Sequence, residues 1–181
     1  MMILINYWIL KMNYMPIDFF TPTCSNTISD SKFGLCDDPP PSIAPAYTDI
    51  IDESKWIAIV NNPNIYEVTF IAVDACLDIR KENGELDSRC DAMLKYQDNI
   101  IFVELKDRGG RAFKWIEKAE SQLRITINHF KNNYLLFNNT KKVAYIANIQ
   151  HPNFRSSQKS RMEKFRDDTG VRLRIENCID L

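Results

Sequence analysis

Two acidic residues and a lysine lie in the middle of the chain in a pattern suited to binding a divalent metal ion. Asp91 directly precedes residues 92–103, and Glu104 and Lys106 follow them with one residue between. Residues 92–103 form two apolar-rich runs joined by a polar tip at 97–98, which predicts a β-hairpin. The three charged side chains would then lie at the open end of that hairpin.

The register of the predicted hairpin decides whether these side chains meet. If residues 97–98 form a two-residue loop, counting equally along both strands places Asp91 directly opposite Glu104. Strand side chains alternate between faces, so Lys106 shares the face of Glu104, and the Cβ atoms of Asp91 and Glu104 lie about 5 Å apart. The opposite face carries apolar residues suited to a core: Ala92, Leu94, Ile101, Val103 and Leu105.

This close pair of carboxylates needs a compensating positive charge, because like charges in a buried place cost stability. Mg²⁺ fits, since it prefers oxygen ligands, keeps several waters and is usually held by one or two carboxylates plus substrate phosphate. A separation above about 8 Å would prevent one Mg²⁺ from sharing both carboxylates. Lys106 would hold or activate a water against a phosphodiester. The alternative is a weak, solvated ion pair between Glu104 and Lys106 on an exposed hairpin.

The arrangement resembles the PD-(D/E)xK nuclease superfamily, whose signature is an Asp at the start of one strand and Glu-x-Lys late in the next. The matching residues are Asp91, Glu104 and Lys106, and Cys90 stands where the family name has Pro. The resemblance covers roughly residues 48–150. It implies a restriction-endonuclease-like core of helix, three-stranded antiparallel meander, helix and further strand, with a Mg²⁺-dependent phosphodiesterase site at the hairpin.

The resemblance also indicates further members of the site. The Leu105 carbonyl would join Asp91 and Glu104 as a metal ligand, with Mn²⁺ as an alternative to Mg²⁺. Apolar residues recur at helical spacing over 111–131, and several nuclease branches of the family place a Gln on this helix, so Gln122 is expected at the site. Many members carry another acidic residue on the first helix, and four candidates remain unranked here: Glu53, Glu67, Asp74 and Asp78.

The remaining segments give a mixture of helices and strands. Residues 48–60 and 66–79 each allow a helix or a strand, whereas 142–148 predicts an interior strand beside the hairpin. A helix over 156–168 would end at Gly170, and 171–175 alternates as an edge strand. The 156–168 helix carries four basic residues that could contact a nucleic-acid backbone: Lys159, Arg161, Lys164 and Arg166.

The chain of 181 residues suits one α/β domain with a central mixed sheet, an antiparallel hairpin carrying the site, and flanking helices. We expect residues 1–47 to form an N-terminal arm and Pro-rich linker, irregular or extended over 21–47, and residues 48–181 to form the nuclease-like domain. No run of about 18 apolar residues indicates a membrane helix. Five cysteines without CxxC spacing argue against a zinc module and a disulfide framework, and favour a reducing cytoplasm.

The net charge of −1 conceals a strong asymmetry. Residues 1–104 hold 16 of the 24 acidic residues, whereas residues 105–181 hold 16 of the 23 basic ones. A basic half that begins at the predicted site suits a surface facing phosphates, because Lys and Arg supply most polyanion affinity. A solvated basic face is the alternative.

The sequence therefore predicts a Mg²⁺-dependent nuclease acting on nucleic acid, with DNA favoured over RNA. The alternative is a catalytically inactive nuclease-fold protein that serves as a protein-binding or nucleic-acid-binding module. The chain has little room for a separate recognition domain, which favours action on DNA structure or ends, or within a larger assembly. The sequence leaves open the base preference, the choice between endonuclease and exonuclease action, and the oligomeric state, for which a homodimer is one option.

Overall fold

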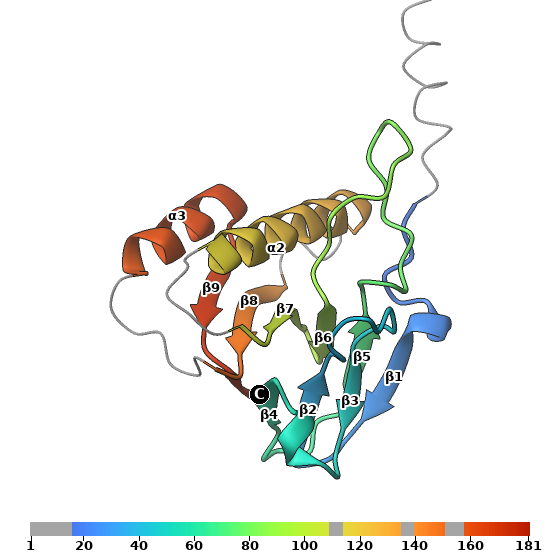
Figure 1. Ribbon diagram of the computed structural model, residues 1–181, viewed down its shortest axis with the longest axis vertical. Helices are drawn as coiled ribbons and strands as arrows, with labels where there is room; N and C mark the ends of the chain where they lie inside the picture. The colour runs from blue at the N-terminus through green and yellow to red at the C-terminus, as the bar shows by residue number, and fades with distance from the viewer. Residues whose placement is uncertain (1–15, 109–113, 135–139, 151–157) are drawn as a thin grey trace, which may run out of the picture.

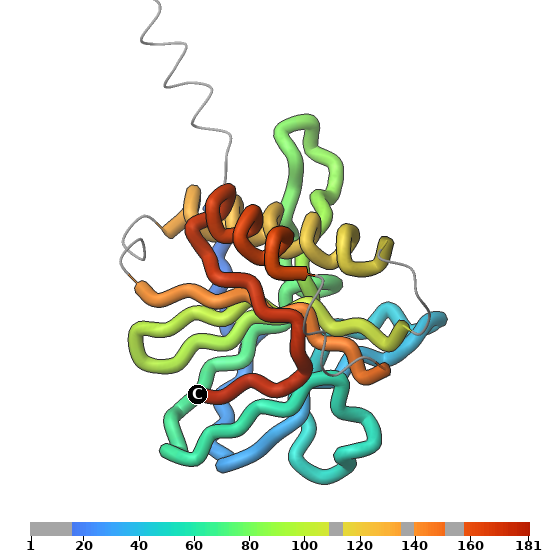
Figure 2. Tube along the Cα trace, turned by 90° about the vertical axis from the view of Figure 1, so that its left-hand side faces the viewer, coloured from blue at the N-terminus to red at the C-terminus, as the bar shows by residue number. Residues whose placement is uncertain are grey.

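The computed structural model describes residues 16–108, 114–134, 140–150 and 158–181, and arranges them in three layers (Figure 1). A six-stranded sheet forms the middle layer, a four-stranded sheet covers one of its faces, and two helices cover the other (Figure 2). The expectation of an α/β protein with a mixed central sheet is confirmed.

The six-stranded sheet has the order β1-β5-β6-β7-β8-β9. Its first four strands are antiparallel, and β7, β8 and β9 run parallel to one another. The strands are β1 (Ser25–Ile28), β5 (Val68–Ala72), β6 (Ala92–Tyr96), β7 (Asn99–Lys106), β8 (Lys141–Asn148) and β9 (Arg172–Ile175). The predicted hairpin, interior strand and closing edge strand correspond to β6–β7, β8 and β9.

The four-stranded sheet has the order β10-β4-β2-β3, and its short strands come from both ends of the described chain. The strands are β2 (Lys32–Cys36), β3 (Tyr47–Asp49), β4 (Ala58–Asn61) and β10 (Cys178–Asp180), with 3₁₀ turns η1 (Pro22–Cys24) and η2 (Glu53–Lys55). Residues 48–60 thus form the end of β3, η2 and the start of β4, without an α-helix. The open alternative for 66–79 resolves to strand β5.

Helices α2 (Lys114–Asn133) and α3 (Lys159–Thr169) pack on the same face of the six-stranded sheet (Figure 1). They correspond to the helices predicted over 111–131 and 156–168, although 111–113 and 156–157 lie outside the described residues. Gly170 ends α3 in the left-handed conformation with φ of 67°, which a residue without Cβ adopts at little cost.

Both faces of β7 are buried, because the central strand has a protein layer on either side. Phe102 and its neighbours on one face pack against α2, while Val103 and Leu105 on the other face pack against the four-stranded sheet. The predicted apolar face of the hairpin therefore faces a core. The face that carries Glu104 is also covered, so the site is built into the interior at the end of the strand.

Residues 21–47, which the sequence indicated as an irregular or extended linker, contain β1 and β2. β1 pairs with β5 in one sheet and β2 pairs with β4 in the other, so this stretch belongs to both sheets. Both strands are short, β1 is mostly polar and β2 has Gly34 at its centre, which explains why their pattern resembles a loop.

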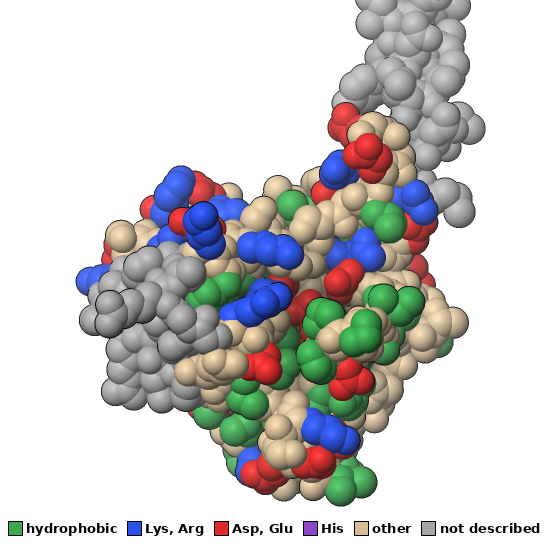
Figure 3. All heavy atoms as spheres, in the orientation of Figure 1, with side chains coloured by type: hydrophobic (Ala, Val, Ile, Leu, Met, Phe, Trp, Pro, Cys, Tyr) green, Lys and Arg blue, Asp and Glu red, His purple; other side chains and the backbone are tan. Residues whose placement is uncertain are grey.

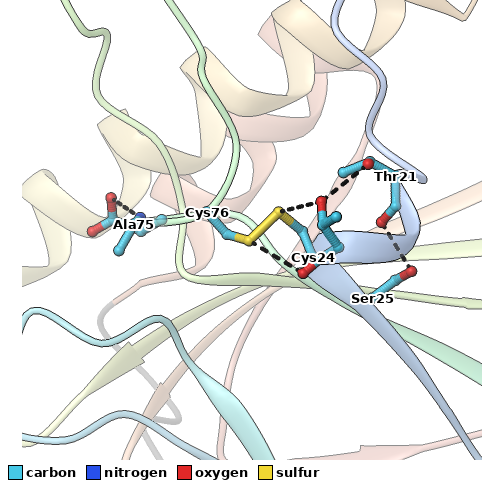
Figure 4. Close-up of a disulfide and its surroundings, with 7 residues drawn as sticks. Thr21, Cys24, Ser25, Ala75 and Cys76 are labelled. Carbon is cyan, nitrogen blue, oxygen red and sulfur yellow. Dashed lines mark hydrogen bonds between the residues drawn. A yellow bond between two sulfur atoms is a disulfide. The ribbon is translucent and has the colours of Figure 1, made fainter.

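The structure contains a disulfide between Cys24 and Cys76, 52 residues apart (Figure 4). This corrects the expectation from the odd cysteine count. Pairing of β1 with β5 brings the segment before β1 close to the turn after β5, and sequence spacing alone does not reveal such an approach. No helix among the described residues is long and apolar enough to cross a membrane.

Candidate functional site

The β6–β7 hairpin has the register that the sequence predicted. Tyr96 pairs with Asn99 across a two-residue turn, and the ladder continues residue by residue to its end. One step beyond that end, Asp91 comes opposite Glu104. The hairpin therefore brings both predicted carboxylates to the same end of the six-stranded sheet.

The backbone of Leu105 faces the Asp91 side of β7. Its N–H donates to Asp91 Oδ2 at 2.5 Å, whereas the carbonyl of Lys106 accepts from the Ile149 N–H on the β8 side at 3.2 Å. Because the N–H and C=O of one strand residue point to the same side, the Leu105 carbonyl is directed toward Asp91, where β6 no longer pairs with β7. This orientation matches its predicted role as an oxygen ligand.

Lys106 joins the two carboxylates. Its ammonium contacts Glu104 Oε1 and lies 3.9 Å from Asp91 Oδ2. The separation of these two oxygens is therefore below the limit of about 8 Å for two carboxylates that share one Mg²⁺. Glu104 is fully buried and Asp91 is 7% exposed. The second oxygen of Glu104, Oε2, has no hydrogen-bond partner among the described residues. One lysine thus compensates the pair only in part.

Burial dominates the acid–base behaviour of the three groups. It raises the pKa of Asp91 to about 6, although Lys106 and the Leu105 N–H oppose the shift. Burial, followed by the charge of Asp91, also raises the pKa of Glu104. For Lys106, burial lowers the pKa but the Glu104 and Asp91 carboxylates outweigh it, so its pKa is raised. The site therefore favours states with added positive charge or bound protons.

The site opens into a pocket of about 610 Å³. Figure 3 shows acidic side chains in the hollow of this face, with Lys and Arg side chains around it. Gln122 of α2, which the family resemblance indicated as a site member, lines the pocket with Asp91 and Lys106. Its amide N–H donates to the Arg89 carbonyl at 2.9 Å, and its Oε1 is buried without a hydrogen-bond partner among the described residues.

Asp74 is the one of the four upstream acidic candidates that lines this pocket. It lies 3.0 Å from Arg89 Nε, and its charge contributes to the raised pKa values of Asp91 and Glu104. The other candidates lie elsewhere: Glu53 pairs with Lys32, Asp78 pairs with Arg80, and Glu67 is exposed.

The pocket residues that were not among the predicted site members include Asp37, Arg108 and Lys118. Asp37 follows β2 and reaches the pocket because the four-stranded sheet packs against the six-stranded one. Burial raises its pKa, while Lys106 opposes the shift. No local motif marks Asp37, since its position depends on how the two sheets pack. Arg108 and Lys118, in contrast, could have been found from the sequence, because both are basic and follow Glu104 closely in the chain.

The donor set fits a magnesium-type ion held partly by water. No group of three or more His, Cys, Asp or Glu side chains among the described residues is arranged to hold a metal ion. The predicted set consists of two carboxylates and one backbone carbonyl, from Asp91, Glu104 and Leu105. Mg²⁺ is commonly held by so few protein oxygens, and the unpartnered Glu104 oxygen supplies a free lone pair.

The basic residues of α3 are largely ion-paired within the protein. Arg161 lies 2.7 Å from Glu120, Lys164 lies 3.0 Å from Asp168, and Lys159 lies 4.0 Å from Glu163.

Comparisons of the chain with protein-family models, curated proteins and solved structures found no match.

Proposed function

We propose that this protein is a Mg²⁺-dependent nuclease with a restriction-endonuclease-like core, which hydrolyses phosphodiester bonds of nucleic acid and prefers DNA to RNA. The observation that carries the proposal is Glu104. This carboxylate is fully buried with one oxygen unpartnered, and it contacts Lys106, which lines an open pocket together with Asp91. A structural role would favour full hydrogen bonding of such a group, whereas a cation-binding role requires a free oxygen.

The order of elements supports the same proposal. The antiparallel meander β5–β6–β7 is followed by α2 and by β8, which adds parallel to β7. This agrees with the meander, helix and further strand that the family resemblance implies. A first helix is replaced here by η2 and β4, and the upstream acidic group comes instead from Asp74 in the turn after β5.

Each site residue has a distinct part in the proposed hydrolysis. Asp91, Glu104 and the Leu105 carbonyl would hold Mg²⁺ or Mn²⁺. The bound ion would polarise the phosphate and lower the pKa of a water. The water oxygen would form a bond to phosphorus and give up a proton to solvent, while the bond to the leaving sugar oxygen breaks and that oxygen takes a proton from solvent. Lys106, with its raised pKa, donates hydrogen bonds that position the water against the phosphate.

The test is cleavage of a panel of linear, branched and single-stranded DNA and RNA with Mg²⁺ or Mn²⁺. We compare wild type with Glu104→Gln and with the control Glu120→Gln, which alters a buried glutamate of α2 outside the pocket. Metal-dependent cleavage should persist in the control and be lost in Glu104→Gln. Cleavage by both variants would contradict the proposal.

Another result of the same panel would favour the second candidate function, a nuclease-fold module that binds without turnover. No group of three or more acidic side chains among the described residues is arranged to hold a metal ion, yet Arg108 and Lys118 line the pocket. If the panel stays intact while the protein retards nucleic acid in a salt-sensitive way, the binding module replaces the nuclease. An intact panel without retardation would point to a protein partner.

A further inference from the structure

The pocket has two unlike walls on either side of the carboxylates. One wall belongs to the helix layer and contains Lys118 of α2. The other belongs to the loop after β2 and contains Pro39 and Pro40. The four-stranded sheet and the helices cover opposite faces of the six-stranded sheet. The two walls therefore lie on opposite sides of the end of β7, where the carboxylates are.

Two of the basic side chains at this pocket, Arg108 and Lys118, differ from those of α3. Arg108 and Lys118 are exposed, and neither forms an ion pair with another described residue, although acidic residues line the same pocket. Arg108 is fixed through its backbone, whose N–H and C=O both bond the Asn148 side chain. Unpaired cations at the rim of a carboxylate site are suited to phosphates on either side of a central one.

The apolar side chains at the pocket mouth are suited to a different part of a nucleotide. Pro39 and Pro40 are exposed at the pocket, and Ile149, which follows β8, is 37% exposed there. Apolar surface of this kind contacts the faces of bases. Paired bases in a duplex are stacked and keep their faces covered, so only an unpaired strand offers them.

Burial of the carboxylates gives a second argument from access. Glu104 is fully buried and Asp91 nearly so, hence a phosphate must enter the pocket to approach them. A volume of about 610 Å³ is that of a small-molecule site, and admits a nucleotide-sized group more readily than an intact duplex.

We propose that the pocket takes a single, unpaired strand of nucleic acid, whose phosphates contact Arg108 and Lys118 and whose bases lie against Pro39, Pro40 and Ile149. This rests on the proposed function for the identity of the ligand as a nucleic acid. It adds that the substrate is single-stranded DNA, or an unpaired end or flap, instead of a continuous duplex.

The experiment measures fluorescence anisotropy in EDTA, with a labelled single-stranded DNA and a blunt duplex of the same sequence over a range of salt concentrations. The variants are Lys118→Gln, Lys118→Arg and Ile149→Ser, and the matched control is Lys159→Gln on α3. Wild type should bind the single strand more tightly. Loss of one phosphate contact in Lys118→Gln should reduce the slope of log affinity against log salt by about 0.7.

The other variants separate the two walls. Lys118→Arg and Lys159→Gln should keep the wild-type slope, whereas Ile149→Ser should weaken single-strand binding without changing the slope, because no phosphate contact is lost. Equal or tighter duplex binding, or an unchanged slope in Lys118→Gln, would overturn the inference. If either of these outcomes is accompanied by metal-dependent cleavage of duplex, the proposed nuclease function still holds and only the single-strand inference fails. Single-strand binding through Lys118 without any cleavage keeps the inference and removes the nuclease.

Discussion

Two buried glutamates, each in contact with a cation, show how different two charged clusters of one protein can be. Glu120 of α2 accepts from Arg124 through one oxygen, at 2.8 Å, and from Arg161 through the other, at 2.7 Å. Glu104 of β7 contacts Lys106 through one oxygen and leaves the other unpartnered. The first cluster joins α2 to α3, and the second lies at a pocket.

The difference shows which cluster the fold itself needs. A carboxylate with two guanidinium partners is electrostatically complete, so its contribution is to hold the two helices together. Two carboxylates that share one ammonium in the interior are incomplete, because burial raises the pKa of both and the single Lys106 charge does not reverse the rise. Incomplete, buried charge beside a pocket is typical of functional sites.

The largest expected effect separates the clusters by activity. Lys106→Met should reduce metal-dependent cleavage by at least about 100-fold, since changes to groups that only support a metal site already cost 10–100-fold. Arg161→Met should leave the cleavage rate unchanged, because Arg161 links α2 to α3 away from the pocket. Initial rates are measured after circular dichroism confirms that both variants fold. A comparable loss in both variants would remove the distinction between the clusters.

The pH dependence of stability should identify Asp91 as part of the incomplete cluster. Its pKa is raised to about 6 in the folded protein, so the folded state binds its proton more tightly than the unfolded state. The contribution to the free energy of unfolding is therefore present below pH about 4 and falls by roughly 3 kcal/mol as pH rises to about 6.

Urea unfolding from pH 4 to 7, in EDTA, measures this change. Asp91→Asn should lose this component of the pH dependence, and Glu120→Gln should retain it. If the free energy of unfolding varies with pH in the same way for Asp91→Asn and wild type between pH 4 and 7, burial does not disfavour the ionised form of Asp91.

Neutralising each glutamate should affect stability in different ways at pH 7. Glu120→Gln should lower the free energy of unfolding by about 1–2 kcal/mol, because two guanidinium groups lose a charged partner. Glu104→Gln should cause no loss and a gain is expected, because it removes one of two neighbouring buried negative charges. Chemical denaturation of both variants tests this. A large loss of stability in Glu104→Gln but not in Glu120→Gln would show that the Glu104 cluster, and not the Glu120 cluster, has the structural role.

Added Mg²⁺ should distinguish the clusters by the smallest of these effects. At ten times its dissociation constant, Mg²⁺ should stabilise the wild-type protein by about 1.4 kcal/mol, as for any ligand of the native state. The melting temperature of Glu104→Gln should not respond, and that of Glu120→Gln should respond like wild type. Equal stabilisation of the wild type and Glu104→Gln would place the cation elsewhere.

Local pattern was sufficient for the hairpin and its neighbours. Alternation and a two-residue tip gave the register that brings Asp91 opposite Glu104, and helical periodicity placed Gln122 on α2, whose side chain lines the pocket. Residues 66–79 could not be assigned from pattern alone, because Val68, Phe70 and Ala72 fit a buried strand while Val68 and Ile71 fit a helix face. Packing in a sheet with protein on both sides decided the strand.

The sequence by itself determined the hairpin, its register and the residue types that meet at its end, because these depend on near neighbours and on a strand period of two. Only the tertiary structure decided the second sheet, the Cys24–Cys76 disulfide, and the choice of Asp74 and Asp37 as pocket residues. These features join segments distant in the chain, and such contacts follow from how layers pack. The unpartnered oxygen of Glu104 belongs to the same class, since hydrogen bonding of a buried atom depends on everything packed around it.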